Sequence, residues 1–200
     1  VTLRVATNFD EGSTFELCVV DETFVVNEQI IAGSDAAFAS VVEDGSNFPT
    51  DDGDLVIISN VRGSASYNSD NVNIQFNSDT TATNYSWQRI GANKTTAYAS
   101  RGDTFANGVM TSNSATSSAF GGGVHHIPRY SDTVGYKTAY SLTAEIILSN
   151  SNDMITQQTT TVWENTAAIA NIQLPTSMLI GSMLSTYRIP STGTNFIERI

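Results

Sequence analysis

The chain of 200 residues carries 20 acidic and 9 basic residues, a formal net charge of −11. This charge argues against nucleic acid and anionic membrane surfaces as partners, because both bind through a cationic surface. The single cysteine, Cys18, excludes an internal disulfide and a cysteine-based zinc site. Ser, Thr and Asn are abundant while Lys and Gln are sparse, which favours strands and turns over long helices.

Residues 1–32 have the pattern of short strands joined by turns. The segments LRVATNF and TFELCVV flank the turn Asp10-Glu11-Gly12, and a second short turn leads to TFVV. We expect an added N-terminal β element, a meander or an arm. It would either complete the sheet of its own chain or pair with a neighbouring chain.

Residues 33–189 are expected to form the main domain. The nearly continuous apolar run Leu55–Val61 predicts a central strand. Alternating apolar and polar residues over Asn71–Asn77 predict a strand with one buried and one solvated face. On the next predicted strand, Tyr85, Trp87 and Arg89 share one face.

The second half of this domain is predicted to alternate between loops and strands. Residues 92–123 indicate long loops around one or two short strands. Tyr136–Ser149 and Ile155–Trp163 predict two strands around a turn, Ala168–Leu174 and Met183–Ile189 predict a last pair, and residues 190–200 form a tail. Ten or more short strands predict an all-β fold, an antiparallel, jelly-roll-like β-sandwich. No apolar run reaches about 18 residues, so no membrane insertion is expected.

Two groups of residues, one of aspartates and one of histidines, have side chains that can bind a metal ion. Asp51, Asp52 and Asp54 could hold Ca²⁺ through oxygen ligands, although a solvated turn before a strand explains them as well. His125 and His126 are adjacent on a predicted strand, so their side chains point to opposite faces and cannot chelate one ion together. A metal shared between subunits, or a structural polar strand end, stays open for this pair.

A second group of residues could contact a partner or a ligand. Arg101-Gly102-Asp103 matches the tripeptide of integrin ligands, but a Gly-centred turn between two charges is the simpler interpretation. Large aromatic residues could stack on sugar rings or serve as core and interface anchors. The candidate contact residues are Tyr85, Trp87, Tyr98, Arg101 and Asp103.

Residues 33–189 resemble a β-sandwich module of tailed-bacteriophage virion proteins. The resemblance rests on FASVVEDG with DLVIISNVR, on IPRY with Tyr136-Lys137-Thr138, on Gly181-Ser182 with Tyr187-Arg188-Ile189, and on Phe76, Asn77, Asp79, Asn84, Tyr85, Trp87, Arg89, Trp163, Asn165, Thr166, Ala167, Ala168 and Ile169. Residues 1–32 have no counterpart in this module, and Glu43 stands at a site where an apolar residue is expected. The resemblance implies a virion surface role without catalysis.

The functional expectation is therefore a virion structural protein, a tail-fibre or spike appendage or a capsid decoration. No nucleophile motif of the Gly-x-Ser-x-Gly type and no phosphate-binding glycine loop is present, so we expect neither enzyme activity nor a cofactor. The expected partners are further copies of the chain, as a homotrimer, other virion proteins and a host surface glycan. The alternative is a carbohydrate-binding, lectin-like module in which Tyr85, Trp87 and Tyr98 are exposed around one shallow site.

Overall fold

The computed structural model describes residues 25–30, 36–38, 53–66, 70–105, 108–116, 118–147 and 154–189. The tail and most of the predicted N-terminal element lie outside these ranges. The elements are β1 (Val25–Ile30), β2 (Ala36–Phe38), β3 (Asp54–Val61), β4 (Asp70–Val72), β5 (Gln75–Phe76), the 3-10 turn η2 (Ala82–Asn84), β6 (Tyr85–Asn93), β7 (Thr96–Gly102), β8 (Gly108–Met110), β9 (Gly121–Ile127), β10 (Lys137–Ile146), β11 (Met154–Trp163), β12 (Ile172–Met178) and β13 (Met183–Ile189).

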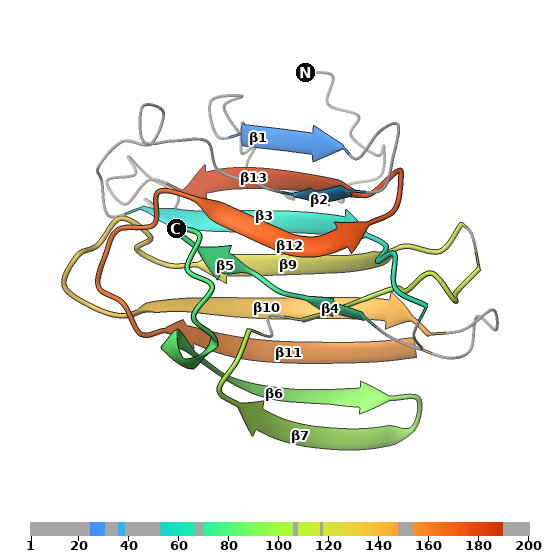
Figure 1. Ribbon diagram of the computed structural model, residues 1–200. Coiled ribbons are helices and arrows are strands. Elements are labelled where there is room, and N and C mark those ends of the chain that lie inside the picture. The colour runs from blue at the N-terminus through green and yellow to red at the C-terminus, as the bar shows by residue number, and fades with distance from the viewer. Residues whose placement is uncertain are drawn as a thin grey trace, which may run out of the picture.

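The strands form one large sheet and two small ones, and every pair of neighbouring strands is antiparallel. The large sheet has eight strands in the order β1-β13-β3-β9-β10-β11-β6-β7 (Figure 1). The small sheets have the orders β2-β12-β5 and β4-β8. The expected all-β antiparallel fold is therefore confirmed for the described residues.

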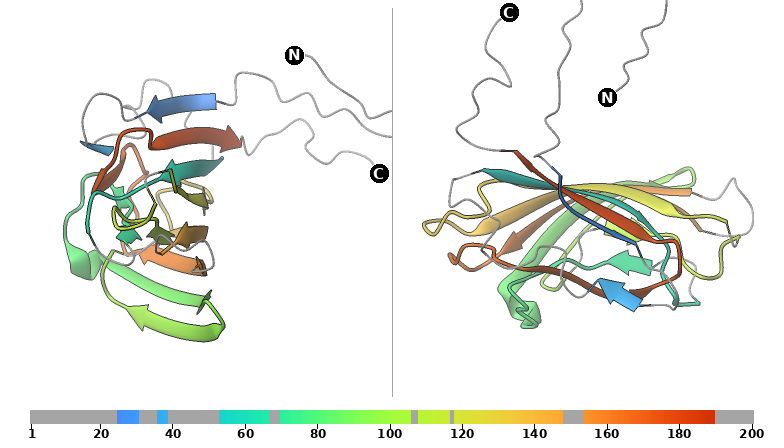
Figure 2. Two further views of the ribbon diagram at one scale, coloured as in Figure 1. Left: turned by 90° about the vertical axis from the view of Figure 1, so that its right-hand side faces the viewer. Right: turned by 90° about the horizontal axis from the view of Figure 1, so that it is seen from above.

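The small sheets cover one face of the large sheet, and the core lies between the two layers (Figure 2). Alternation explains this core, because every second residue of a strand points to the same face. The large sheet contributes Leu55, Ile57 and Trp163, and the small sheets contribute Phe76 and Leu174, all of them fully or almost fully buried. We call the face toward this core the inner face and the opposite one the outer face.

Several predicted strands are confirmed. The run Leu55–Val61 is part of β3 near the centre of the large sheet. The two predicted strands around the turn at 150–153 are β10 and β11, which pair from Lys137↔Trp163 to Ile146↔Met154. The segment Asn71–Asn77 does bury Val72, Ile74 and Phe76, but it divides into β4 and β5, which pair with different strands.

One prediction about pairing is wrong. The predicted last pair does not exist, because β12 pairs with β2 and β5 whereas β13 pairs with β1 and β3. The register of β12 with β2 shifts between Leu174 and Met178, a segment that includes Pro175, and proline lacks the N–H group needed for regular pairing. The one or two short strands expected in residues 92–123 are β7 and β8, between the end of β6 and the start of β9, and β7 has seven residues.

The position of β1 bears on the predicted N-terminal element. Val25–Ile30 pairs with β13 and so extends the large sheet of its own chain. Of the two arrangements expected for this element, the described stretch has the one in which it pairs within its own chain.

Asp79 connects the segment after β5 in the small sheets to Trp163 of the large sheet through hydrogen bonds. Its carboxylate accepts hydrogen bonds from the Trp163 indole nitrogen at 2.8 Å, from the Asn84 side-chain amide at 2.8 Å and from the Thr81 backbone at 2.9 Å. The Tyr85 hydroxyl donates to the Asp79 carbonyl at 3.2 Å. Burial tends to raise the pKa of Asp79, but these hydrogen bonds outweigh it and lower the pKa. Several residues that carry the virion-module resemblance thus have a structural role.

Candidate binding surface on the large sheet

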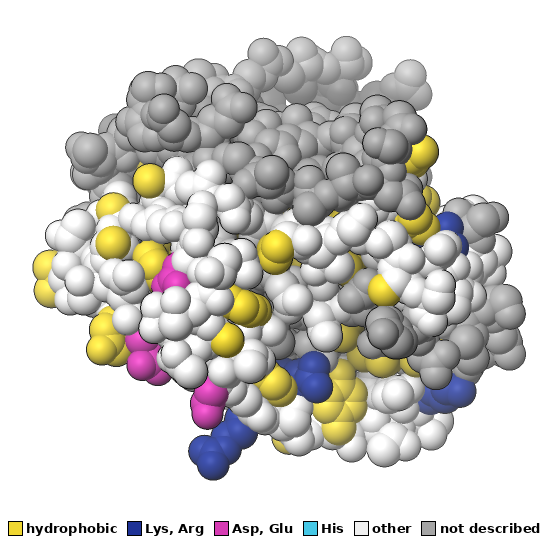
Figure 3. All heavy atoms as spheres, in the orientation of Figure 1, with side chains coloured by type: hydrophobic (Ala, Val, Ile, Leu, Met, Phe, Trp, Pro, Cys, Tyr) yellow, Lys and Arg dark blue, Asp and Glu magenta, His cyan; other side chains and the backbone are white. Residues whose placement is uncertain are grey.

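The outer face carries exposed apolar side chains in lateral register. Ile58 of β3 pairs with Val124 of β9, which pairs with Leu142 of β10. These three side chains are 43, 44 and 64% exposed, and Ile90 of β6 is 56% exposed. On the opposite side of the molecule, the coloured apolar side chains lie scattered among polar atoms (Figure 3). Ile58, Val124 and Leu142 are direct neighbours, whereas Gln158 of β11 lies between Leu142 and Ile90. Because contiguous exposed apolar side chains often mark an interaction site, this row is a candidate binding surface.

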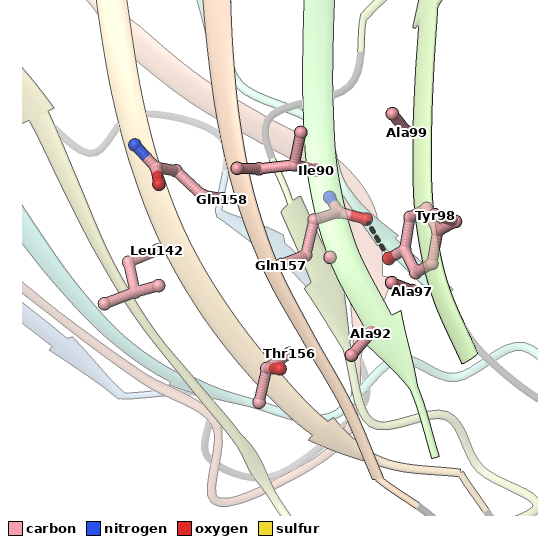
Figure 4. A pocket seen from close by; sticks show the side chains of 10 residues that line it. Ile90, Ala92, Ala97, Tyr98, Ala99, Leu142, Thr156, Gln157 and Gln158 are labelled. Carbon is pink, nitrogen blue, oxygen red and sulfur yellow. Dashed lines mark hydrogen bonds between the residues drawn. The ribbon is translucent and has the colours of Figure 1, made fainter. Parts of the chain in front are cut away.

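A shallow hollow of about 650 Å³ lies over β11, β6 and β7. Ile90, Ala92, Ala97 and Ala99 line it from the hairpin, and Leu142 lines it from β10 (Figure 4). The small alanine side chains leave the space that the hollow occupies. The surface is therefore apolar and concave next to an exposed leucine.

The floor of this hollow depends on a glycine. A Cβ at Gly91 would lie 2.8 Å from the Tyr98 ring and 2.5 Å from the Thr156 carbonyl oxygen. Tyr98 therefore packs over Gly91 on the inner face, where its hydroxyl donates to Gln157 Oε1 at 2.8 Å. This contact joins β7 to β11 across β6 and stiffens the hairpin under the hollow.

A second hollow, of about 480 Å³, lies over β3, β9 and β10. Ile58, Val124 and Leu142 line it together with the small residues Gly122 and Ala144. Leu142 lines both hollows and so stands between them.

A third hollow, of about 370 Å³, gathers three of the five predicted contact residues. Trp87, Arg101 and Asp103 line it together with Gln88 and Thr160. It combines one indole ring with donors and acceptors of both charges. Arg101 and Asp103 are exposed at the end of β7 and beyond it, as expected of the predicted Gly-centred turn.

The predicted aromatic residues do not converge on one exposed site. Tyr85 is fully buried between Phe76, Phe105 and Trp163, so the expectation that it is exposed is wrong. Tyr85 begins β6 at the point where the small sheets cover the large one, and its ring completes the core. Its burial, with the neighbouring charge of Asp79 and despite a hydrogen bond from the Phe76 backbone, raises its pKa to about 12.

Trp87 and Tyr98 are half-buried on either side of Arg89. The guanidinium carbon of Arg89 lies 4.7 Å from the Trp87 ring centroid and 5.9 Å from that of Tyr98, within cation–π range. Arg89 Nε also donates to Ser100 Oγ at 2.7 Å. The prediction that Tyr85, Trp87 and Arg89 share one face of their strand is confirmed. The contacts of Arg89 with Trp87 and with Ser100 stabilise the hairpin of β6 and β7.

The predicted cation site is only partly described. Asp51 and Asp52 lie outside the described residues. Asp54 Oδ2 contacts His126 Nε2 at 2.7 Å, and Oδ1 accepts the Arg129 backbone N–H at 2.9 Å. Within the described ranges, no group of three His, Cys, Asp or Glu side chains is arranged to hold a metal ion.

The two histidines point to opposite faces, as predicted. His126 lies on the outer face beside Asp54, whereas His125 lies fully buried on the inner face. The His125 ring contacts Ser141 Oγ at 2.8 Å and Ser59 Oγ at 3.3 Å. Burial lowers the pKa of His125 to about 4, so the ring is neutral at physiological pH.

Sequence reasoning did not single out Ile58, Val124, Leu142 and Ile90. A usable signal was present in β3, which has apolar residues on both faces although, within the described residues, only its inner face is covered by another sheet. A strand with two apolar faces is typical of a sheet buried on both sides. The run Leu55–Val61 was interpreted only as a central strand, and its apolar outer positions Val56 and Ile58 were the signal that could have identified this face.

Among the described residues, the structure contains no helix with the length and hydropathy of a membrane span. No family model matches the chain, and neither a search of curated proteins nor a search of solved structures finds a match. The fold and its surfaces therefore carry the functional argument.

Proposed function

We propose that this chain is a structural module of a bacteriophage virion, displayed at its surface as an appendage or a decoration. The proposal is supported by the virion-module resemblance of residues 33–189 and by the all-β, antiparallel, two-layered fold of the described residues. The observation that carries it is the exposed apolar outer face, with Ile58, Val124 and Leu142 in register. A structural virion protein binds other virion proteins through a surface of this kind. The proposal assigns no catalytic role to the chain.

Location in particles tests this proposal. Antibodies against the purified protein should label the exterior of virus particles from the source at regular positions, and the protein should sediment with the particles. Leu142→Glu should reduce incorporation, because it places a charge on the outer face. Val134→Glu is the matched control, since Val134 is an exposed apolar residue in the loop before β10. A protein found only in the unsedimented fraction contradicts the proposal.

The second candidate function is carbohydrate binding at the third hollow. The half-buried indole of Trp87, over which Arg89 lies, contributes an aromatic edge to this hollow. Arg101 and Asp103 offer charged donors and acceptors for sugar hydroxyl groups. A glycan array tests it, with Trp87→Ala expected to abolish any saturable binding and Leu142→Glu expected to preserve it. Equal binding by the parent and Trp87→Ala rules out this site.

A further inference from the structure

The outer face has the shape of a surface that can bind its own copy. Leu142 projects between the two apolar hollows and is the most exposed of the four apolar residues described above. Small residues floor each hollow, with Gly122 and Ala144 on one side and Ala97 and Ala99 on the other. A projection beside a hollow on one surface is the requirement for an isologous contact, in which the projection of each copy fills the hollow of the other.

The charge distribution favours the same occupant. The chain has a net charge of −11, so two copies repel each other where their carboxylates approach. Among the described outward-facing positions from β3 to β7, Asp54 is the only carboxylate, and it lies at the end of β3 beside His126. Arg101, at the other margin, is the only Lys or Arg there. The face thus offers an approach with little like-charge repulsion and little attraction for a strongly charged partner.

The size of the face is sufficient. From β13 to β7 it crosses seven strands, which at about 4.8 Å per spacing span about 29 Å. Strands of about eight residues extend about 27 Å. The resulting area of about 780 Å² per copy is close to the roughly 800 Å² that each partner buries in a standard stable interface.

We propose that the outer face binds the outer face of a second copy of this chain, forming a two-fold, sheet-on-sheet dimer with Leu142 near its centre. This inference does not depend on the proposed virion role, because it rests on the shape, charge and size of the face alone. The stoichiometry predicted from the sequence is a trimer, so the measured mass distinguishes the two arrangements.

Light scattering during size-exclusion chromatography tests the proposal on the full chain. At about 100 µM the parent should have twice the 21.4 kDa mass of one chain. Leu142→Glu should give the mass of one chain with an unchanged circular dichroism spectrum, because an exposed position tolerates a charge without unfolding. Val134→Glu should remain dimeric. A monomeric or trimeric parent, or a dimeric Leu142→Glu variant, overturns the proposal.

A second measurement distinguishes two ways of covering the outer face, by a second copy of the chain or by a segment of the same chain. In the Leu142→Cys variant, the introduced thiol should be protected from alkylation at about 100 µM and should react at about 1 µM, where the dimer dissociates. Mass spectrometry locates the label at position 142 and separates it from Cys18. Protection that persists at a concentration where light scattering gives the mass of one chain means that the chain covers its own face, and it overturns the proposal.

Discussion

Acidification should destabilise this protein through one buried ring, that of His125. The ring is fully buried, its two nitrogens contact serine hydroxyl groups, and burial lowers its pKa from 6.5 to about 4. In the unfolded chain the same ring takes up a proton near its ordinary pKa. Between these two pKa values the unfolded state therefore binds more protons than the folded state, and the free energy of unfolding falls as the pH falls.

The lowering of the His125 pKa determines how much stability is lost on acidification. The contribution of His125 is fully present above a pH of about 6.5 and is lost progressively down to a pH of about 4. At about 1.4 kcal/mol for each pKa unit, the complete loss amounts to about 3 kcal/mol. Most of that loss, about 2.5 kcal/mol, is reached at a pH of about 4.5.

Urea unfolding of the parent and of two variants measures this loss. His125→Gln removes the titrating ring, and its amide can still hydrogen-bond to Ser59 and Ser141, so its stability should fall less between about pH 7 and about pH 4.5. His126→Gln changes a side chain on the outer face and should retain the loss ascribed to His125. An equal pH dependence of the parent and His125→Gln would refute the reasoning.

Three further substitutions should act through identified contacts, and thermal or urea unfolding measures each. Asp79→Ala removes the acceptor of the Trp163 indole and should cost about 2–3 kcal/mol; an unchanged stability would show that water replaces the carboxylate. Gly91→Val should cost more than about 2 kcal/mol, because its Cβ would overlap Tyr98 and Thr156. Gly122→Ala is its control and should be nearly neutral, since its Cβ has no neighbour closer than 3.9 Å; equal effects would contradict the steric argument. Arg62→Met should cost about 3 kcal/mol, because the guanidinium donates to the carbonyl oxygens of residues 112, 113 and 115, and a neutral effect would show that these loops need no such support.

Local pattern predicted the strands and their faces. The run Leu55–Val61 and the alternation in Tyr85–Ile90 identified β3 and the two faces of β6, because the direction of a side chain in a strand depends only on the position of its residue. The opposite directions of His125 and His126 followed from the same rule. The position of β7 was not predicted, since its alanine-rich sequence has little apolar contrast and its strand form depends on pairing with β6.

Tertiary structure decided the pairing of the strands and the exposure of each face. β12 and β13 are close in the sequence but lie in different sheets, because contacts with β2, β5, β1 and β3, distant in the chain, determine their partners. Tyr85 is buried and Leu142 is exposed although both lie on strands of the large sheet. The sequence indicates that both side chains prefer an apolar environment. Among the described residues, the small sheets cover the inner face, and their position places Tyr85 in the core while Leu142 faces outward.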